Sequence, residues 1–313
     1  MVDILLSTFN GERFLPDLLD SLMGQSCESW RLLVRDDGSH DQTPALLQHY
    51  QSRSPRRIQI VEIGPNLGAS RSFGRLCEFS SSPYVMFCDQ DDVWLPHKVE
   101  KSLESIAGLE SLHGAETPLV VFSDLIVADE NLNVLHRSFA RYCRRPGRNA
   151  VLPRLLLRNV APGCSMIVNR SLLRKALPVP EEAVMYDYWF MLVAAAFGRI
   201  AHMDEPTVLY RRHERNVFEV EAPRREGLGA TLARLRTAWI FRHKGYYLDP
   251  RILQQANALL LRFRDELSAE RRSLLEDFLQ LPMLPPKKRK VFLLKHRIFP
   301  YGLLGNLELL LGI

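Results

Sequence analysis

The stretch Phe87-Cys88-Asp89-Gln90-Asp91-Asp92-Val93-Trp94 decides how this chain is interpreted. The apolar segment 84–87 leads directly into it, so a strand is expected to end in three carboxylates. Carboxylates this close repel one another, and burial would raise their pKa values unless a cation is bound. Oxygen ligands in a short turn suit a hard cation such as Mg2+ or Mn2+. The alternative interpretation is a solvated acidic turn that caps a helix beginning near Pro96.

Expected strands and helices alternate along the residues that lead to this turn. Strands are expected from Val2 onward and over 30–34, 58–61 and 84–87, and helices over 14–22, 46–50 and 73–79. The helices are inferred from apolar residues at helical spacing. This alternation predicts an α/β fold, Rossmann-like, with a mainly parallel sheet flanked by helices and joined by right-handed crossovers. Polar motifs at successive strand ends then share one edge of the sheet, where open α/β sheets bind ligands.

Four polar motifs follow the expected strands in order. They are Ser7-Thr8-Phe9-Asn10-Gly11, Arg35-Asp36-Asp37-Gly38-Ser39, Asn66-Leu67-Gly68 and Asp89-Gln90-Asp91-Asp92. As an ordered set, they resemble the family 2 glycosyltransferases, which have the GT-A fold. Three later segments, 161–166, 186–189 and 209–217, also look like segments of that family. Asp89 to Trp94 together with Tyr210 to Val217 is similar to bacterial rhamnosyltransferase-like members, and the resemblance covers about residues 2–218.

The resemblance implies a nucleotide-sugar donor, linked through dTDP or UDP, along this edge of the sheet. It assigns donor binding to Thr8, Phe9, Asn10, Glu12, Asp36, Asp37, Asn66, Gly68, Arg71, Asp89, Gln90, Gly163 and Arg211. In this assignment Phe9 stacks on the base and Asp36 or Asp37 accepts the base N–H, while Gly163 permits a close backbone approach to the sugar. The residues by themselves also allow a core phenylalanine at Phe9, helix capping by Asp37 and an ordinary surface arginine at Arg71.

The metal and catalytic residues are implied in the same way. Asp91 would be the principal ligand of Mn2+ or Mg2+, and His213 would be a further ligand, a diphosphate contact or an ordinary loop histidine. Asp187 matches the catalytic carboxylate of the family, which takes the proton of the acceptor hydroxyl in an inverting transfer. The residue before it is Tyr186, where relatives commonly carry Glu or His.

The substrates follow from the same resemblance. The first candidate donor is dTDP-L-rhamnose, and the alternative is a UDP-hexose or UDP-N-acetylhexosamine. The expected acceptor is a glycan or glycolipid of the cell surface, such as lipopolysaccharide core, O-antigen or a capsule precursor. Two other function classes stay open. A nucleotidyltransferase would need a Gly-rich basic loop that residues 7–11 lack, and a pure binding module would not need a metal paired with a base.

The composition limits the class of protein, its compartment and its partners. Charged residues make up 25% of the 313 residues and hydrophobic residues 46%, which is ordinary for a globular protein. Five cysteines without a C-x-x-C pair favour reduced thiols and a cytoplasmic protein. No run reaches the roughly 18 to 20 apolar residues of a membrane span, and no signal peptide is expected. The net charge of +5 comes without a recognisable nucleic-acid-binding motif, so no nucleic-acid partner is expected.

The pattern changes after about residue 218. We expect a GT-A domain over 1–220 and a basic, helical C-terminal region over 221–313. Within that region the cations Lys287-Lys288-Arg289-Lys290 stand between two prolines and the apolar run 291–294. Cations beside apolar residues suit peripheral contact with an anionic membrane, here the cytoplasmic face of the inner membrane. The alternative is a helical subdomain with a solvated basic face.

Overall fold

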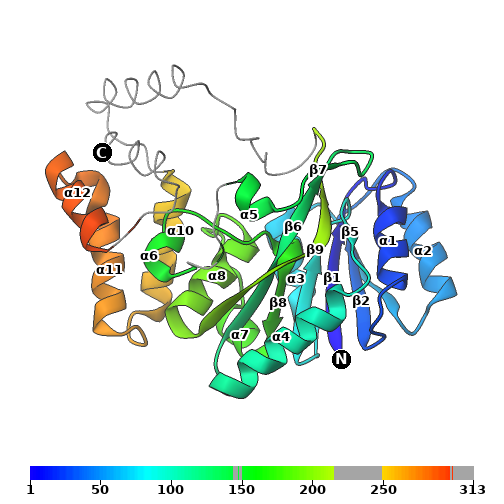
Figure 1. The fold of residues 1–313 in the computed structure, drawn as a ribbon, viewed down its shortest axis with the longest axis horizontal. Helices are drawn as coiled ribbons and strands as arrows, with labels where there is room; N and C mark the ends of the chain where they lie inside the picture. Colours follow the sequence, from blue (N-terminus) through cyan, green and yellow to red (C-terminus); the bar gives the residue numbers. More distant parts are fainter. Residues whose placement is uncertain (144–146, 148–149, 215–248, 297, 299–313) are drawn as a thin grey trace.

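The apolar runs that precede the acidic turn form four parallel strands in the order β3-β2-β1-β4 (Figure 1). The computed structural model describes residues 1–143, 147, 150–214, 249–296 and 298. The strands are β1 (Val2–Thr8), β2 (Trp30–Asp36), β3 (Ile58–Ile63) and β4 (Tyr84–Cys88). The helices between them are α1 (Leu15–Met23), α2 (Thr43–Arg53) and α3 (Ala69–Phe79). The predicted alternation is confirmed, and the polar motifs lie together at the carboxyl ends of these strands.

The second half of the sheet is mixed. Its strands are β5 (Val93–Trp94), β6 (Leu119–Ala128), β7 (Val134–His136), β8 (Met166–Asn169) and β9 (Arg199–Arg211). The order continues from β4 as β8-β6-β9-β5, and β7 pairs with β6. Strand β8 is antiparallel to both β4 and β6, whereas β6 and β9 are parallel. Parallel pairing is therefore confined to β1–β4 and to β6–β9, within the α/β architecture that the sequence predicts.

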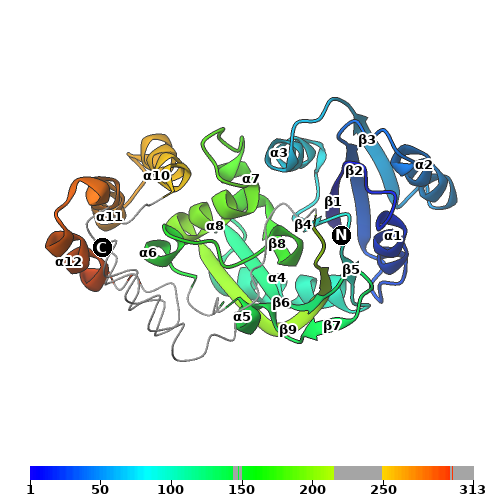
Figure 2. The same cartoon turned by 90° about the horizontal axis from the view of Figure 1, so that it is seen from above.

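Alternate side chains of β1 enter two apolar cores, one on each face of the sheet. Ile4 and Leu6 belong to the core under α1, α2 and α4 (Lys98–His113). Leu5 belongs to the core under α3, α7 (Arg170–Ala176) and α8 (Tyr186–Phe197). Figure 2 shows these helix layers on either side of the strands. The connections also carry α5 (Phe139–Tyr142), α6 (Leu152–Leu155) and the 3-10 turn η2 (Gly163–Ser165).

The C-terminal helices extend the core beside α8 (Figure 1). They are α10 (Pro250–Phe263), α11 (Ala269–Gln280), the 3-10 turn η4 (Leu281–Met283) and α12 (Pro286–Lys295). The Phe263 ring stacks on Trp189 of α8 with centroids 6.4 Å apart, which anchors α10. The predicted helical extension is confirmed, whereas the predicted boundary at residue 220 falls in 215–248, outside the described residues.

Two details of this region bear on membrane contact. The prolines before the basic cluster begin α12 instead of ending a helix, because Pro286 occupies the first turn. Among the helices that the structure describes, none combines the length and apolar character needed to span a bilayer.

Candidate functional site

The end of β1 and the loop after β2 are joined through the carboxylate of Asp36, which is fully buried. Thr8 Oγ1 donates to Asp36 Oδ2 at 2.8 Å. Ser39 donates twice, from its backbone N–H at 2.8 Å and from its hydroxyl at 2.7 Å. Asp36 therefore holds two predicted donor-binding loops in a fixed relation before any ligand arrives.

Asp37 binds the loop that follows β3. Its Oδ2 accepts the backbone N–H groups of Leu67 and Gly68, each at 3.0 Å, and its carboxylate also pairs with buried Arg35. Asn66 Oδ1 accepts the same Gly68 N–H at 2.8 Å, and Gly68 has a φ of 76°, where glycine is favoured. Since Asp36 and Asp37 both have protein partners, contact of either carboxylate with a base stays a prediction.

Phe9 is presented at the surface of this edge, with 41% of its area exposed. The Gln90 side chain of the acidic turn bonds both backbone groups of Phe9, accepting its N–H at 2.9 Å and donating to its carbonyl at 3.0 Å. A Cβ at Gly11 would overlap Gln90 Oε1, so a larger residue there would displace the Gln90 amide from Phe9. The core alternative for Phe9 is wrong, and an exposed ring at a strand end is available for stacking.

Asn10 and Glu12 bind the loop that leads into α2. Asn10 Oδ1 accepts the His40 N–H at 2.9 Å, and Glu12 Oε2 accepts the Gln42 N–H at 2.8 Å. Asn10 has a φ of 48°, a left-handed conformation that asparagine tolerates better than most residues. Both side chains thus shape the predicted donor edge, and their contact with a donor stays a prediction.

The two predicted donor-binding arginines have other partners. Arg71 is exposed and pairs with Glu181 at 2.8 Å. Arg211 is buried, and its guanidinium donates to the carbonyls of Asp91 and Glu130 at 2.8 and 2.7 Å and to Asp17 at 2.6 Å. Arg211 thus joins β9 to the acidic turn and to α1, so its visible role is to hold the turn in place.

The acidic turn meets the end of β9 through Asp91 and His213. His213 Nε2 lies 2.7 Å from Asp91 Oδ2, and the imidazole stacks on Phe14 with ring centroids 5.0 Å apart. The side chains are 10% and 17% exposed, so the pair can be reached from outside. One carboxylate oxygen and one imidazole nitrogen this close fit Mn2+ or Mg2+, which complete their coordination with water and phosphate oxygens.

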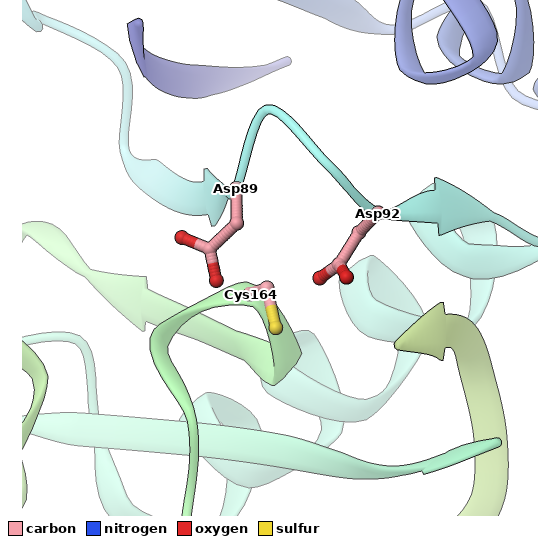
Figure 3. A group of neighbouring side chains, drawn as sticks. All are labelled: Asp89, Asp92 and Cys164. Atoms are coloured by element: carbon pink, nitrogen blue, oxygen red, sulfur yellow. The ribbon is translucent and has the colours of Figure 1, made fainter. Parts of the chain in front are cut away.

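A second cluster lies deeper in the same turn. In Figure 3 the carboxylates of Asp89 and Asp92 point toward Cys164, and ligand atoms of the three residues lie within 4.8 Å of one another. Burial, followed by the charges of Asp91 and Asp187, raises the pKa of Asp89 to about 7. Burial also raises the pKa of the Cys164 thiol well above its usual value, so the sulfur stays protonated. A protonated thiol is a poor ligand for a hard cation, so this cluster fits Mn2+ or Mg2+ less well than Asp91 and His213 do.

Lys98 supplies positive charge beneath this cluster. Its side chain is fully buried, Nζ donates to Thr207 Oγ1 at 3.2 Å, and it lies 4.6 Å from the centre of the Trp94 ring. Burial lowers the pKa of Lys98 to about 8, against the opposing effect of Cys164 and Asp92. A resident cation beside Asp92 is a further reason why a metal ion fits Asp91 better than Asp92.

Asp187 lies in the first turn of α8 and faces the loop before β8. Gly163 N–H donates to Asp187 Oδ2 at 2.9 Å, and the N–H of Tyr188 donates to Oδ1 at 2.5 Å. The predicted base and the predicted sugar-facing glycine are therefore in contact. A Cβ at Gly163 would overlap Tyr186 Oη, so the glycine is required by Tyr186 and need not be explained by the sugar.

Sequence reasoning missed three groups that shape the site. Lys98 lies on one helix face with Ser102 and Ile106, so its burial was foreseeable from the spacing. Tyr186 stood out only as a departure from the family pattern. Asp17 on α1 gave no signal, because its contact with Arg211 joins residues far apart in the sequence.

Comparison with known proteins gives an independent view. Residues 3–113 match the family model described as Glycosyl transferase family 2. The chain is similar to TuaG of Bacillus subtilis, named for teichuronic acid biosynthesis, with 33% identity over 33% of this chain and 41% of TuaG. It is also similar to the dTDP-rhamnosyl transferase RfbG of Shigella flexneri, with 22% identity over 67% of this chain and 72% of RfbG. The aligned part thus covers less than half of one of these relatives.

Solved structures support the fold. The structure of S. aureus TarS 1-349 in complex with UDP-GlcNAc has a TM-score of 0.54 and 17% identity, covering 99% of this chain and 90% of that one. The mannosyltransferase PcManGT from Pyrobaculum calidifontis, in complex with GDP-Man and Mn2+, has a TM-score of 0.50 and 16% identity over 95% of this chain and 86% of that one. At such identities the likeness establishes the fold alone, and the GT-A architecture expected from the sequence is confirmed.

Proposed function

We propose that this chain, whose residues 3–113 match the family 2 glycosyltransferase model, transfers a sugar from a nucleotide-sugar donor to a cell-surface glycan acceptor. One observation carries the proposal: the Asp91–His213 pair and the Asp187–Gly163 contact lie at the same edge as the exposed Phe9 ring. That edge combines an aromatic ring for the nucleotide base, a place for a cation that binds the diphosphate, and a carboxylate near the position of the sugar. A pure binding module has no use for the last of these.

The donor site is proposed as follows. Phe9 stacks on the base, and the loops held by Asp36 and Asp37 line its edge. Asp91 and His213 hold Mn2+ or Mg2+, an assignment supported by the 2.7 Å separation of their ligand atoms. A divalent cation held there would neutralise charge that develops on the leaving nucleoside diphosphate. Manganese in the similar PcManGT structure agrees with this choice.

Asp187 is proposed as the general base. The backbone donors Gly163 and Tyr188 fix the orientation of its carboxylate. In an inverting transfer, the acceptor hydroxyl gives its proton to Asp187 as its oxygen forms a bond to the anomeric carbon. The bond from that carbon to the diphosphate oxygen breaks, and the electron pair leaves with the nucleoside diphosphate. General-base catalysis of this kind contributes about 10^2- to 10^4-fold.

The proposed donor is dTDP-L-rhamnose, supported by the similarity to RfbG. A UDP-linked donor is the second candidate, because the similar TarS structure contains UDP-GlcNAc. The proposed acceptor is lipopolysaccharide core, O-antigen or a capsule precursor. The names of TuaG and RfbG support cell-surface polysaccharides as the general class.

The deciding experiment is a nucleotide-sugar panel. The protein is incubated with dTDP-L-rhamnose, UDP-glucose, UDP-galactose or UDP-N-acetylglucosamine, with Mn2+ or with EDTA, and released nucleoside diphosphate is measured. We expect metal-dependent release from one donor, faster when a membrane glycolipid extract supplies the acceptor. Release of pyrophosphate from dTTP and a sugar phosphate would instead identify a nucleotidyltransferase. Binding of donors without release of nucleoside diphosphate would identify a binding module.

Peripheral membrane contact at the cytoplasmic face is part of the proposal. Helix α12 carries no carboxylate. Val291 and Leu294 are 62% and 55% exposed, and Lys287, Lys288 and Lys295 are exposed as well. Two apolar side chains among cations are the pattern of an element that inserts shallowly into an anionic surface. Each cation near such a surface contributes about 1 kcal/mol.

Vesicle sedimentation tests this contact. The full chain should bind vesicles of phosphatidylglycerol and phosphatidylethanolamine more tightly than phosphatidylcholine vesicles, and less tightly as salt rises. Lys287→Glu/Lys288→Glu should release it, whereas the matched change Arg53→Glu/Arg56→Glu, at exposed residues near the end of α2, should not. Equal binding of both double variants would contradict a membrane role for α12.

A further inference from the structure

Tyr186 lies at the start of α8 with its ring buried in an aromatic cluster. The ring centroid is 4.4 Å from that of Phe73 and 5.0 Å from that of Phe87, and only 3% of the residue is exposed. Packing on this scale fixes the position of the phenol ring. The direction of the hydroxyl is therefore set by the fold and needs no ligand to arrange it.

No hydrogen bond joins the hydroxyl of this ring to another residue that the structure describes, and its oxygen is not among the fully buried polar atoms left without a partner, so solvent reaches it. The O–H of a buried tyrosine normally finds a partner in the protein, whereas this hydroxyl is left to water or to a ligand. Tyr188, two residues later and equally buried, follows the rule: its hydroxyl donates to the Leu155 carbonyl at 2.6 Å. The contrast between the two tyrosines shows that, within the described part of the chain, Tyr186 Oη is open to a ligand and Tyr188 Oη is not.

The surroundings of the hydroxyl indicate which ligand it could contact. Gly163 lies so close to Oη that a Cβ there would overlap it. Burial, and then the charges of Asp89 and Asp187, raise the pKa of Tyr186 well above its usual value, so the group stays protonated and can donate. Asp89 stands on the acidic turn that carries Asp91, and Asp187 stands on the acceptor side. A group between them lies between the diphosphate and the acceptor hydroxyl, which is the position of the transferred sugar.

We propose that Tyr186 Oη donates a hydrogen bond to the transferred sugar and so helps to select the donor. This inference rests on the proposed function, since it concerns the same site. The position of the phenol is fixed and its hydroxyl is protonated. It can therefore donate a hydrogen bond only to a sugar that places an oxygen within reach. A donor without that oxygen would displace water from the hydroxyl without replacing its hydrogen bond, which is costly and therefore selective.

The test separates sugar from nucleotide. Tyr186→Phe removes only the hydroxyl and keeps the ring packing. We expect unchanged affinity for UDP and dTDP. The affinity and kcat/KM should fall about 3- to 10-fold for the nucleotide sugar from which wild type releases nucleoside diphosphate. We would test dTDP-L-rhamnose first. The matched control is Tyr84→Phe, at the start of β4 and so at the opposite end of that strand from the acidic turn. This variant loses a hydroxyl that donates to Glu110 and should bind both ligands like wild type.

Gly163→Ala gives a second, independent readout. The added Cβ must displace the Tyr186 hydroxyl, so this variant should show the same selective loss for the nucleotide sugar. In the Tyr186→Phe background the further loss should be smaller, because the two changes disturb the same contact. Wild-type behaviour of Tyr186→Phe, or equal weakening of nucleotide and nucleotide sugar, would overturn the inference. Absence of release from every donor by wild type would instead overturn the proposed function.

Discussion

The two sides of the proposed site use their polar side chains differently. On the side of β1 to β3, the side chains of Asp36, Asp37 and Asn10 bond to neighbouring loops. On the α8 side, Asp187 is held by two backbone N–H groups, and the hydroxyl of Tyr186 has no partner in the described part of the chain. The β1 to β3 side is held by hydrogen bonds within the chain, whereas the α8 side leaves the Tyr186 hydroxyl available to a ligand.

This difference shows which residues can be changed with which consequence. Where a polar side chain already bonds to the protein, its loss should be seen first in stability. Where it faces the ligand, its loss should be seen in transfer with the fold intact. Loss of the Asp91–His213 pair should affect both stability and transfer, because the pair links two chain segments and is also accessible.

Asp91→Ala should have the largest effect. Loss of the proposed metal ligand should lower transfer about 10^3-fold, equivalent to about 4 kcal/mol, since a cation stabilises the leaving diphosphate. Calorimetric titration with dTDP or UDP should show that Mn2+ no longer strengthens binding. Glu104→Ala, at an exposed carboxylate of α4, is the control. Unchanged metal-dependent affinity in Asp91→Ala would remove Asp91 from the metal site.

Asp37→Ala should act on stability. It leaves the buried guanidinium of Arg35 without one of its carboxylate partners and should lower the free energy of unfolding by about 3 kcal/mol. The comparison is Glu28→Ala, which breaks the surface pair with Arg57 and should cost under about 1 kcal/mol. Urea unfolding of both variants measures the difference. Similar costs for the two variants would contradict a rigid β1–β3 edge.

Asp187→Asn should act on chemistry alone. The amide keeps the size of the side chain but cannot take the acceptor proton, so turnover should fall at least about 10^2-fold, equivalent to about 2.7 kcal/mol. Nucleotide affinity should stay close to that of wild type. Transfer rates and nucleotide titration on the same samples separate the two effects. Near-normal turnover would move the base elsewhere, and Glu182→Gln would then test the neighbouring exposed carboxylate.

Asp89→Asn should have the smallest effect, a shift in pH dependence. The pKa of Asp89 rises on folding from about 3.8 to about 7, so its contribution to stability is present at low pH and is lost between these values. Without metal, the variant should therefore melt a few degrees above wild type near pH 8 and about equally near pH 4.

Asp129 provides a control of opposite sign for this shift. Hydrogen bonds from Asn133 lower the pKa of Asp129. Asp129→Asn should therefore lower the melting temperature most at neutral pH, in thermal unfolding from pH 4 to 8 in EDTA. A pH-independent difference between Asp89→Asn and wild type would mean that burial does not perturb Asp89.

Much of the fold was predictable because its signals are local. The strands and helices up to β4 follow from apolar runs and helical spacing, and the burial of α8 follows from its apolar sequence. The mixed pairing of β8 with β4 and β6 was not predictable, because strand neighbours are chosen by packing between segments far apart in the chain. For the same reason, Arg211 was expected to bind the donor and is seen to hold the acidic turn.

The sequence by itself determined the strand-end motifs, the acidic turn and the presence of an aspartate at the start of α8. These are properties of neighbouring residues, and backbone geometry carries them into the structure. Only the tertiary structure decided that Asp91 meets His213 across 122 residues and that Gly163 lies against both Asp187 and Tyr186. Such contacts depend on strand order and helix packing, which are set by the free energy of the whole core and by no single stretch of the chain.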